Sequence, residues 1–307
     1  MSEAGLPETG EVEVTDAAEA ADLVEGIVRE TEDPTVQSPR LLIVLDIDGT
    51  VILEDESLSP GVVDAIEDAH AVGHRVMIAT GRSWEGTVGI LRALGIAPEF
   101  VVCSNGAVVL RRVGELADPE GDLRYERFHV ETFDPAEVLT MLREHLPDAH
   151  YLVELPDGRR LYTEYLDDWN LSQAQRVPFA ELSAHPVCRV VVVAPEQGEQ
   201  DFVDLVARIG LNQVSYAVGW TAWLDIAPQG VDKSTGLQIV RDELGVAPAD
   251  VLVIGDGRND LGMFAWARRN GGRAVAMQQG PQEVRDAASE VTLSVQEGGV
   301  AAVLRSL

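Results

Sequence analysis

The sequence predicts an α/β protein in which a parallel-sheet core carries an inserted α/β cap domain. Residues 41–45 form a continuous apolar run, which is typical of a strand buried on both faces of a parallel sheet. Strand-like runs then alternate with helical stripes in two separate stretches, residues 41–112 and 223–307. The intervening residues 113–222 hold enough strand-like and helical runs for a domain of their own, so we expect the core to be discontinuous.

The first core stretch predicts a βαβαβ unit. Ser59 and Pro60 supply a helix N-cap and a proline at the first helical position, and an apolar stripe at helical spacing follows until Gly73. The later elements of this stretch are expected as a strand at 74–79, a helix at 84–94 and a strand at 100–103.

The late stretch repeats the alternation, so we expect both stretches to build one sheet. Its expected strands lie at 223–226, 251–254 and 274–277, and its helices at 234–244, 261–267, 281–287 and 299–307. Within the insert we expect strands at 151–154, 160–163, 187–193 and 214–218, and helices at 135–146 and 200–209. A ligand cleft is expected between core and insert.

Composition narrows the possible partners and the location. The chain has 52 acidic against 23 basic residues and a net charge of −29, without any short window rich in Lys or Arg, so nucleic acid and anionic membranes are disfavoured as partners. We expect a cytoplasmic protein, because we find neither a membrane-spanning apolar run nor a signal peptide. Residues 1–40 hold eleven acids and two bases, and we expect an acidic extension that is disordered or partly helical.

Two carboxylates directly follow the first apolar strand. Asp46 and Asp48 are two residues apart, so alternation along the strand places them on one side, at the edge where parallel sheets bind ligands. The alternatives are a solvated turn and a calcium loop. An EF-hand would need further ligands that this segment lacks.

A second acidic group follows the apolar strand at 251–254. Asp256 and Asp260 lie in the string Gly-Asp-Gly-Arg-Asn-Asp, and two acidic strand ends can converge on one cation. Oxygen ligands without Cys or His suit Mg²⁺ better than Zn²⁺. The string does not match a dinucleotide-binding fingerprint, so NAD is set aside.

Two further segments could bind an anion. Thr80, Gly81 and Arg82 close the second strand before a helix N-terminus, and offer a hydroxyl group and a close approach to the backbone. Lys233 opens a late helix, but the glycine that a P-loop has before its lysine is missing. Taken alone, Lys233 is expected to be a surface residue.

The order and spacing of these four sites resemble the motifs of the haloacid dehalogenase (HAD) superfamily. The matching segments are residues 46–50, Thr80, Lys233 and residues 255–260. The large insert, together with Ser-Asn-Gly-Ala at 104–107, is similar to the Cof-like subfamily with a type IIB α/β cap. The resemblance spans residues 41–307 and implies a Rossmann-like core.

The resemblance also implies a reaction and a set of roles. It implies a Mg²⁺-dependent phosphatase for a small phosphorylated metabolite, most broadly a sugar phosphate, in which Asp46 forms an aspartyl-phosphate and Asp48 serves as acid and base. Thr80 and Lys233 would stabilise the phosphoryl group. The implied Mg²⁺ ligands are Asp46, Asp48 through its carbonyl, and Asp256, with Asp260 in support, while the implied phosphate or substrate contacts are Gly81, Arg82, Asn105 and Asn259.

Three other functions stay open at this point. A phosphomutase or another phosphoryl transferase would use the same nucleophile, a non-hydrolytic regulatory protein would keep its aspartyl-phosphate, and a binding protein would have lost catalysis. The sequence does not reveal the substrate, the oligomeric state or the purpose of the acidic extension.

Overall fold

The computed structural model describes residues 40–114, 123–165, 171, 173–209, 211, 214–218 and 222–307. The predicted acidic extension, residues 1–40, lies outside these residues apart from Arg40. Residues 40–307 form one compact unit.

A five-stranded parallel sheet in the order β14-β13-β12-β1-β2 forms the core. Strand β1 comes from the early stretch and pairs with β12 from the late one, so one sheet joins the two stretches as the sequence predicts. All residues of β1 are buried, as its continuous apolar run requires. The strands are β1 (Leu42–Leu45), β2 (Arg75–Ile78), β12 (Val251–Gly255), β13 (Arg273–Ala276) and β14 (Glu290–Val291).

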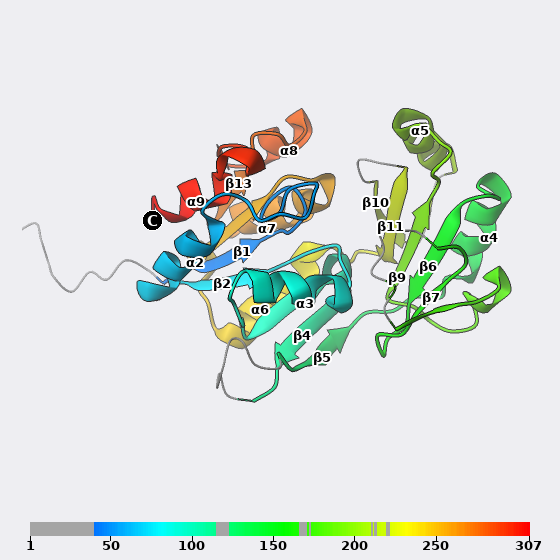
Figure 1. Ribbon diagram of the computed structural model, residues 1–307, viewed down its shortest axis with the longest axis horizontal. Coiled ribbons are helices and arrows are strands. Elements are labelled where there is room, and N and C mark those ends of the chain that lie inside the picture. The colour runs from blue at the N-terminus through cyan, green and yellow to red at the C-terminus, as the bar shows by residue number, and fades with distance from the viewer. Residues whose placement is uncertain are drawn as a thin grey trace, which may run out of the picture. The chain divides into compact units, whose positions relative to one another are not determined.

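Helices cover both faces of this sheet (Figure 1). Alternate residues of β1 point to opposite sides, so Ile43 packs in one apolar cluster and Val44 in another. The cluster of Ile43 includes α2 (Val62–Ala71), α3 (Trp84–Ala93) and α9 (Gly299–Leu304). The cluster of Val44 includes α6 (Lys233–Leu244), α7 (Leu261–Arg269) and α8 (Gln282–Ala287).

Helix α2 begins later than predicted. Its N-cap is Gly61 with φ of 70°, and the first helical residue is Val62. Ser59 does not cap the helix, because its hydroxyl group donates a hydrogen bond to the Val295 carbonyl at 2.7 Å. The hydroxyl group that the local sequence predicts as the helix cap therefore binds a distant backbone carbonyl instead.

A three-stranded antiparallel sheet adjoins the end of β2. It contains β3 (Phe100–Cys103), β4 (Val108–Arg112) and β5 (Tyr125–Val130), and a parallel bridge between Ala79 and Val102 links it to the end of β2. The sequence pattern predicts β3 but not β4 or β5. The predicted domain boundary at residue 112 falls between these two paired strands, and the division into core and cap stays a prediction.

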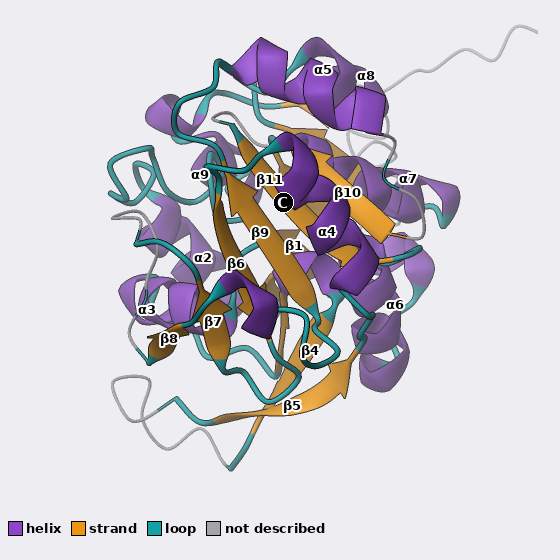
Figure 2. Cartoon of the chain, turned by 90° about the vertical axis from the view of Figure 1, so that its right-hand side faces the viewer, coloured by secondary structure: helices purple, strands orange, loops and turns teal. Residues whose placement is uncertain are grey.

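A six-stranded sheet in the order β10-β11-β9-β6-β7-β8 is built from residues 150–228. The expectation that the strand at 223–226 belongs to the core sheet is wrong, because this strand, β11, pairs antiparallel with β9 and β10. Figure 2 shows α4 (Ala136–His145) in front of this sheet. Together with α5 (Glu199–Ile209), α4 packs on the face that carries Tyr151, Val190 and Leu224. The strands are β6 (His150–Glu154), β7 (Arg160–Tyr162), β8 (Ala174–Arg176), β9 (Arg189–Val193), β10 (Val214–Val218) and β11 (Trp223–Pro228). The five-stranded parallel sheet and the helices on both of its faces confirm the predicted α/β class with a parallel-sheet core.

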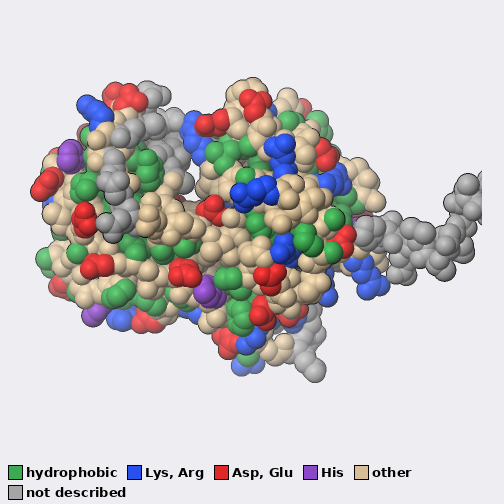
Figure 3. All heavy atoms as spheres, turned by 180° about the vertical axis from the view of Figure 1, so that it is seen from behind, with side chains coloured by type: hydrophobic (Ala, Val, Ile, Leu, Met, Phe, Trp, Pro, Cys, Tyr) green, Lys and Arg blue, Asp and Glu red, His purple; other side chains and the backbone are tan. Residues whose placement is uncertain are grey.

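Acidic and basic side chains are interspersed on the face of the molecule that Figure 3 draws. Within the described segments, every helix is too short or too polar to span a bilayer. The expectation that the chain avoids nucleic acid and membranes stays a prediction.

Candidate active site

The polar residues singled out in the sequence lie at the carboxyl ends of neighbouring strands. Asp46 follows β1 and Asp256 follows β12, and these parallel strands remain paired as far as Leu45 and Ile254. Thr80 lies two residues beyond β2, the other neighbour of β1. Lys233 is the first residue of α6, and its side chain reaches Asp46. One edge of the sheet therefore carries all four predicted motifs.

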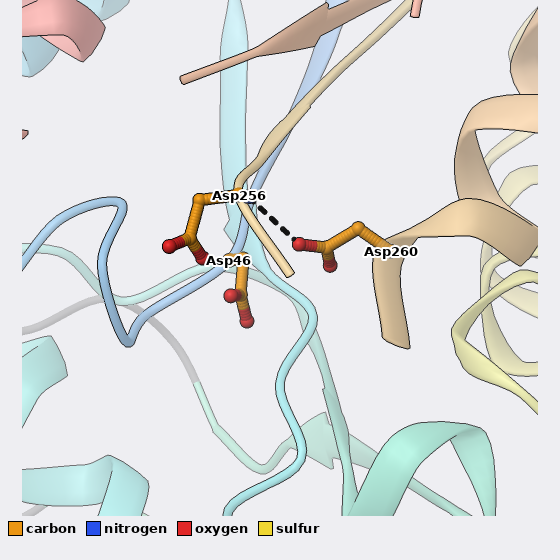
Figure 4. A group of neighbouring side chains, drawn as sticks. All are labelled: Asp46, Asp256 and Asp260. Carbon is orange, nitrogen blue, oxygen red and sulfur yellow. Dashed lines mark hydrogen bonds between the residues drawn. The ribbon is translucent and has the colours of Figure 1, made fainter. Parts of the chain in front are cut away.

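Three buried carboxylates converge at this edge (Figure 4). Asp46, Asp256 and Asp260 each offer one oxygen, and these three oxygens lie within 4.8 Å of one another. The three residues are 3%, 4% and 0% exposed. A compact group of carboxylate oxygens is the donor set that hard divalent cations such as Mg²⁺ prefer, so these residues fit the predicted metal.

Lys233 places a positive charge inside this acidic group. Its Nζ lies 2.6 Å from Asp46 Oδ1 and 2.6 Å from Asp260 Oδ1, and the residue is fully buried. Asp232 caps the N-terminus of α6 by accepting a hydrogen bond from the Ser234 amide, which fixes the start of the helix next to Lys233. Lys233 is the only lysine among the 307 residues, and it is not the surface residue that its sequence context alone allowed.

Asp260 joins the lysine to the turn that follows β12. Its Oδ1 accepts a hydrogen bond from Lys233, while its Oδ2 accepts from the backbone amides of Asp256 and Gly257, both at 2.9 Å. Both oxygens of Asp260 therefore have partners within the protein. This arrangement favours a role in orienting Lys233 and Asp256 over a role as a direct metal ligand.

The pKa values of the group reflect its excess of negative charge. Burial, and then the charge of Asp260, raises the pKa of Asp46 well above its ordinary value, although Lys233 opposes this. Burial and the charge of Asp260 also raise the pKa of Asp256, to about 7. Burial by itself lowers the pKa of Lys233, but Asp260 and Asp46 outweigh it and raise that pKa above its ordinary value. A bound cation would relieve the repulsion between the carboxylates.

Asp48 lies in a different environment from Asp46. Its side chain is 58% exposed and forms a forked ion pair with Arg82, whose Nη2 lies 2.6 Å from Oδ1 and whose Nε lies 3.0 Å from Oδ2. Glu56 also contacts the guanidinium group of Arg82, at 3.3 Å. Asp46 and Asp48 thus differ in solvent access and in their cationic partner. Such a difference in environment is what allows two neighbouring carboxylates to serve different chemical roles.

Asn105 and Asn259 meet beside the Thr80 loop. The amide nitrogen of the Asn259 side chain donates to Asn105 Oδ1 at 3.1 Å, and the backbone amide of Asn105 donates to the Thr80 carbonyl at 3.0 Å. Gly81 faces the Asn105 carboxamide so closely that an added Cβ would lie 3.1 Å from it. The weaker predicted contacts, Gly81, Arg82, Asn105 and Asn259, thus lie on three adjoining segments, which follow β2, β3 and β12.

Gln279 also contacts the acidic group and was not predicted from the sequence. Its Nε2 donates to the Gly49 carbonyl at 2.6 Å and to Asp256 Oδ2 at 3.3 Å, while its Oε1 accepts from the Val295 amide at 3.1 Å. The available signal was its position just after the predicted strand at 274–277. Gly49, with φ of 69°, lies so close that a Cβ there would be 2.1 Å from Asp256 Oδ2, which explains the glycine of the first motif.

Several known proteins are similar to this chain over most of its length. The chain matches the family model for haloacid dehalogenase-like hydrolases over residues 43–304. A 5-amino-6-(5-phospho-D-ribitylamino)uracil phosphatase of Bacillus subtilis is 26% identical over 274 residues, which cover 86% of this chain and 96% of that protein. A phosphoglycolate phosphatase of Natronomonas pharaonis is 29% identical over 250 residues, covering 81% and 90%.

Solved structures share the fold. A sugar phosphatase of HAD subclass IIB superposes with a TM-score of 0.69 at 19% identity, covering 87% of this chain and 98% of that one. A protein of Thermotoga maritima gives a TM-score of 0.64 at 22% identity, covering 87% and 97%. At these identities the likeness concerns the fold alone.

Proposed function

The chain belongs to the haloacid dehalogenase-like hydrolase family, and from this premise we propose that it is a Mg²⁺-dependent phosphatase of small phosphorylated metabolites, with sugar phosphates the broadest class. The observation that carries the proposal is Asp46, a buried carboxylate at a strand end that is held by Lys233 at 2.6 Å. The phosphatases among its relatives support the reaction type.

Asp46 is the proposed nucleophile. Its carboxylate attacks phosphorus, and an oxygen–phosphorus bond to Asp46 forms as the bond to the leaving oxygen breaks. Lys233, already in contact with Oδ1, reduces the repulsion between this carboxylate and the phosphoryl group. Water then attacks the same phosphorus, and the bond to Asp46 breaks to release inorganic phosphate.

Asp48 is the proposed proton carrier. In the first half it donates a proton to the leaving oxygen, and in the second half it accepts a proton from the attacking water. Its exposure gives it access to both the leaving group and solvent. Arg82 orients its carboxylate through the forked ion pair.

The buried carboxylates of Asp46 and Asp256 would hold the metal, with Asp260 behind them. When bound, Mg²⁺ would neutralise negative charge on the phosphoryl group and on the two carboxylates. Gln279 would keep Asp256 oriented through its hydrogen bond to Oδ2.

Thr80 is the proposed hydroxyl donor to the phosphoryl group. Its Oγ1 accepts a hydrogen bond from the Arg82 amide at 3.1 Å, which leaves the hydroxyl hydrogen for a phosphoryl oxygen. Thr80 is fully buried, so this contact requires the phosphoryl group to enter as deeply as Asp46.

The test is release of inorganic phosphate from a panel containing sugar phosphates, phosphoglycolate and p-nitrophenyl phosphate. We expect release with Mg²⁺, loss with EDTA and loss in Asp46→Asn, whereas Asp286→Asn, on an exposed helical surface, keeps wild-type rates. An isomeric phosphate ester in place of free phosphate would indicate a mutase. A stable phosphorylated protein without turnover would indicate a regulatory phospho-acceptor.

A further inference from the structure

The turn after β3 adopts a backbone conformation that needs support. Ser104 has φ of 51° and Asn105 has φ of 50°, so two successive non-glycine residues are left-handed. Each such residue costs about 1 kcal/mol or more relative to ordinary backbone, somewhat less for Asn. Contacts elsewhere must therefore hold residues 104–106 in place.

This turn touches three segments of the candidate active site. The amides of Ser104 and Asn105 donate to the carbonyls of Arg82 and Thr80 at 2.9 and 3.0 Å. The Asn105 side chain accepts from Asn259. On its other side Gly106 packs so tightly on the residue before Lys233 that a Cβ would lie 1.9 Å from that residue's carbonyl oxygen. A shift of the turn would therefore move several proposed site residues together.

A carboxylate from the six-stranded sheet holds this turn. Glu154, the last residue of β6, is fully buried, and its Oε2 accepts a hydrogen bond from the Ser104 hydroxyl at 2.8 Å. Its Oε1 accepts from Arg127 Nη2 on β5, also at 2.8 Å. One side chain thus connects the turn after β3, strand β5 and the six-stranded sheet.

The cost of burial makes this contact informative. A buried carboxylate loses its hydration, and an apolar residue of similar volume often gives equal or greater stability at such a position. Stability alone is therefore a weak explanation for Glu154. The hydrogen bond to Ser104 fixes one orientation of the strained turn, which an apolar contact, lacking direction, would not do.

We propose that Glu154 is a positioning residue, which acts through Ser104 to hold Asn105 and the Thr80 loop in the geometry that phosphoryl transfer needs. This inference rests on the proposed function. It adds that a residue of the six-stranded sheet helps to position the candidate active site. Glu154 itself touches neither the phosphoryl group nor the metal in this assignment.

Three single variants and one double variant test the proposal. Ser104→Ala removes the donor, Glu154→Leu removes the acceptor, and Glu154→Gln keeps an oxygen that can accept from Ser104. The double variant combines Ser104→Ala with Glu154→Leu. Tyr151→Phe is the matched control, because it removes a buried hydrogen bond, from the Tyr151 hydroxyl to the Leu146 carbonyl at 2.8 Å, on the same strand.

Turnover of p-nitrophenyl phosphate is the first measurement. We expect Ser104→Ala and Glu154→Leu each to lower kcat about tenfold with KM within about twofold, because small displacements in an active site act mainly on the transition state. The double variant should be no slower than the slower single variant, since both remove the same hydrogen bond. Glu154→Gln should stay within about threefold of wild type, and Tyr151→Phe should lose stability without losing kcat.

Affinity for orthovanadate with Mg²⁺, measured by calorimetry, is the second measurement and does not require turnover. We expect Ser104→Ala to weaken it about tenfold. If wild type binds vanadate but hydrolyses no member of the panel, the proposed function is wrong. The vanadate affinities of the variants then still decide this inference. The inference is overturned if Ser104→Ala keeps both kcat and vanadate affinity within about twofold of wild type, or if the effects of the two sites multiply. If Glu154→Leu does not fold, Ser104→Ala with its control decides alone.

Discussion

Lys233 Nζ lies 2.6 Å from Asp46 Oδ1 at a place where both side chains are almost completely closed to solvent. The same nitrogen lies 2.6 Å from Asp260, so one ammonium group serves two buried carboxylates. Surface ion pairs contribute little to stability, but removing one partner of a buried group leaves an uncompensated charge. The pairing therefore has consequences for both folding and catalysis.

Lys233→Met should destabilise the protein and inactivate it. We expect the free energy of unfolding at pH 8 in EDTA to fall by about 3 kcal/mol, because Asp46 and Asp260 lose their common cation. Phosphate release should fall at least about 100-fold. Urea denaturation and the phosphate assay check this, with Arg273→Met as a control that removes an exposed ion pair to Glu290. Equal losses in the two variants would contradict the prediction.

Asp256→Asn should stabilise the metal-free protein at high pH. The folded pKa of about 7 lies above the ordinary value of 3.8, so the folded chain binds more protons between these values and its stability falls as pH rises through this window. Removing the charge should raise the free energy of unfolding by roughly 2 kcal/mol at pH 8 in EDTA, with the gain disappearing near pH 4.

Urea denaturation of wild type and Asp256→Asn at several pH values measures this difference. Added Mg²⁺ should stabilise wild type but not the variant, because the proposed ligand is lost. A difference that stays constant between pH 4 and pH 8 would show that Asp256 does not carry the raised pKa.

Asp48→Asn should separate the two halves of the proposed reaction. An alkyl phosphate needs a proton on its leaving oxygen, so its turnover should fall at least about 100-fold. With p-nitrophenyl phosphate, whose leaving group needs little protonation, the first half should continue and the phosphorylated protein should accumulate. Rapid-quench mass spectrometry measures the added phosphoryl group, and equal losses on both substrates without this species would refute the role of Asp48.

Gln279→Leu should weaken Mg²⁺ binding. The variant loses the hydrogen bonds to Asp256 and to the Gly49 carbonyl, so the carboxylate is no longer held. Loss of such supporting contacts typically lowers metal affinity 10- to 100-fold, and we expect about tenfold by calorimetry. Gln282→Leu, on the exposed surface of α8, should bind Mg²⁺ like wild type. Identical affinities for the two variants would remove Gln279 from the site.

The strand ends that carry the site were predictable from the sequence because their signal is local. Continuous apolar runs identified β1 and β12 as buried parallel strands, and parallel strands present their carboxyl ends at one edge. Asp46 and Asp256 directly follow those runs, so their convergence follows from topology. The burial of Lys233 was not predictable in this way, because it depends on two carboxylates, 187 and 27 residues away.

What the sequence did not reveal depends on tertiary partners. Ser59 has the local signature of a helix cap, yet its hydroxyl group bonds to Val295, 236 residues away. Strands β4 and β5 lie on either side of the predicted domain boundary and were not recognised as a pair. Glu154 carried no local signal, since its hydrogen bond to Ser104 forms only when β6 meets the turn at Ser104, 50 residues earlier.

The complete burial of the only lysine makes the folded chain a poor target for lysine-directed reagents. A protease that cuts after lysine has one cleavage site, between Lys233 and Ser234 at the first turn of α6. Cleavage there requires the candidate active site to open, and it yields two fragments, residues 1–233 and 234–307. With enough protease for cleavage to outpace reclosing, the rate of this single cut gives the rate at which that site opens, without a label or an introduced residue.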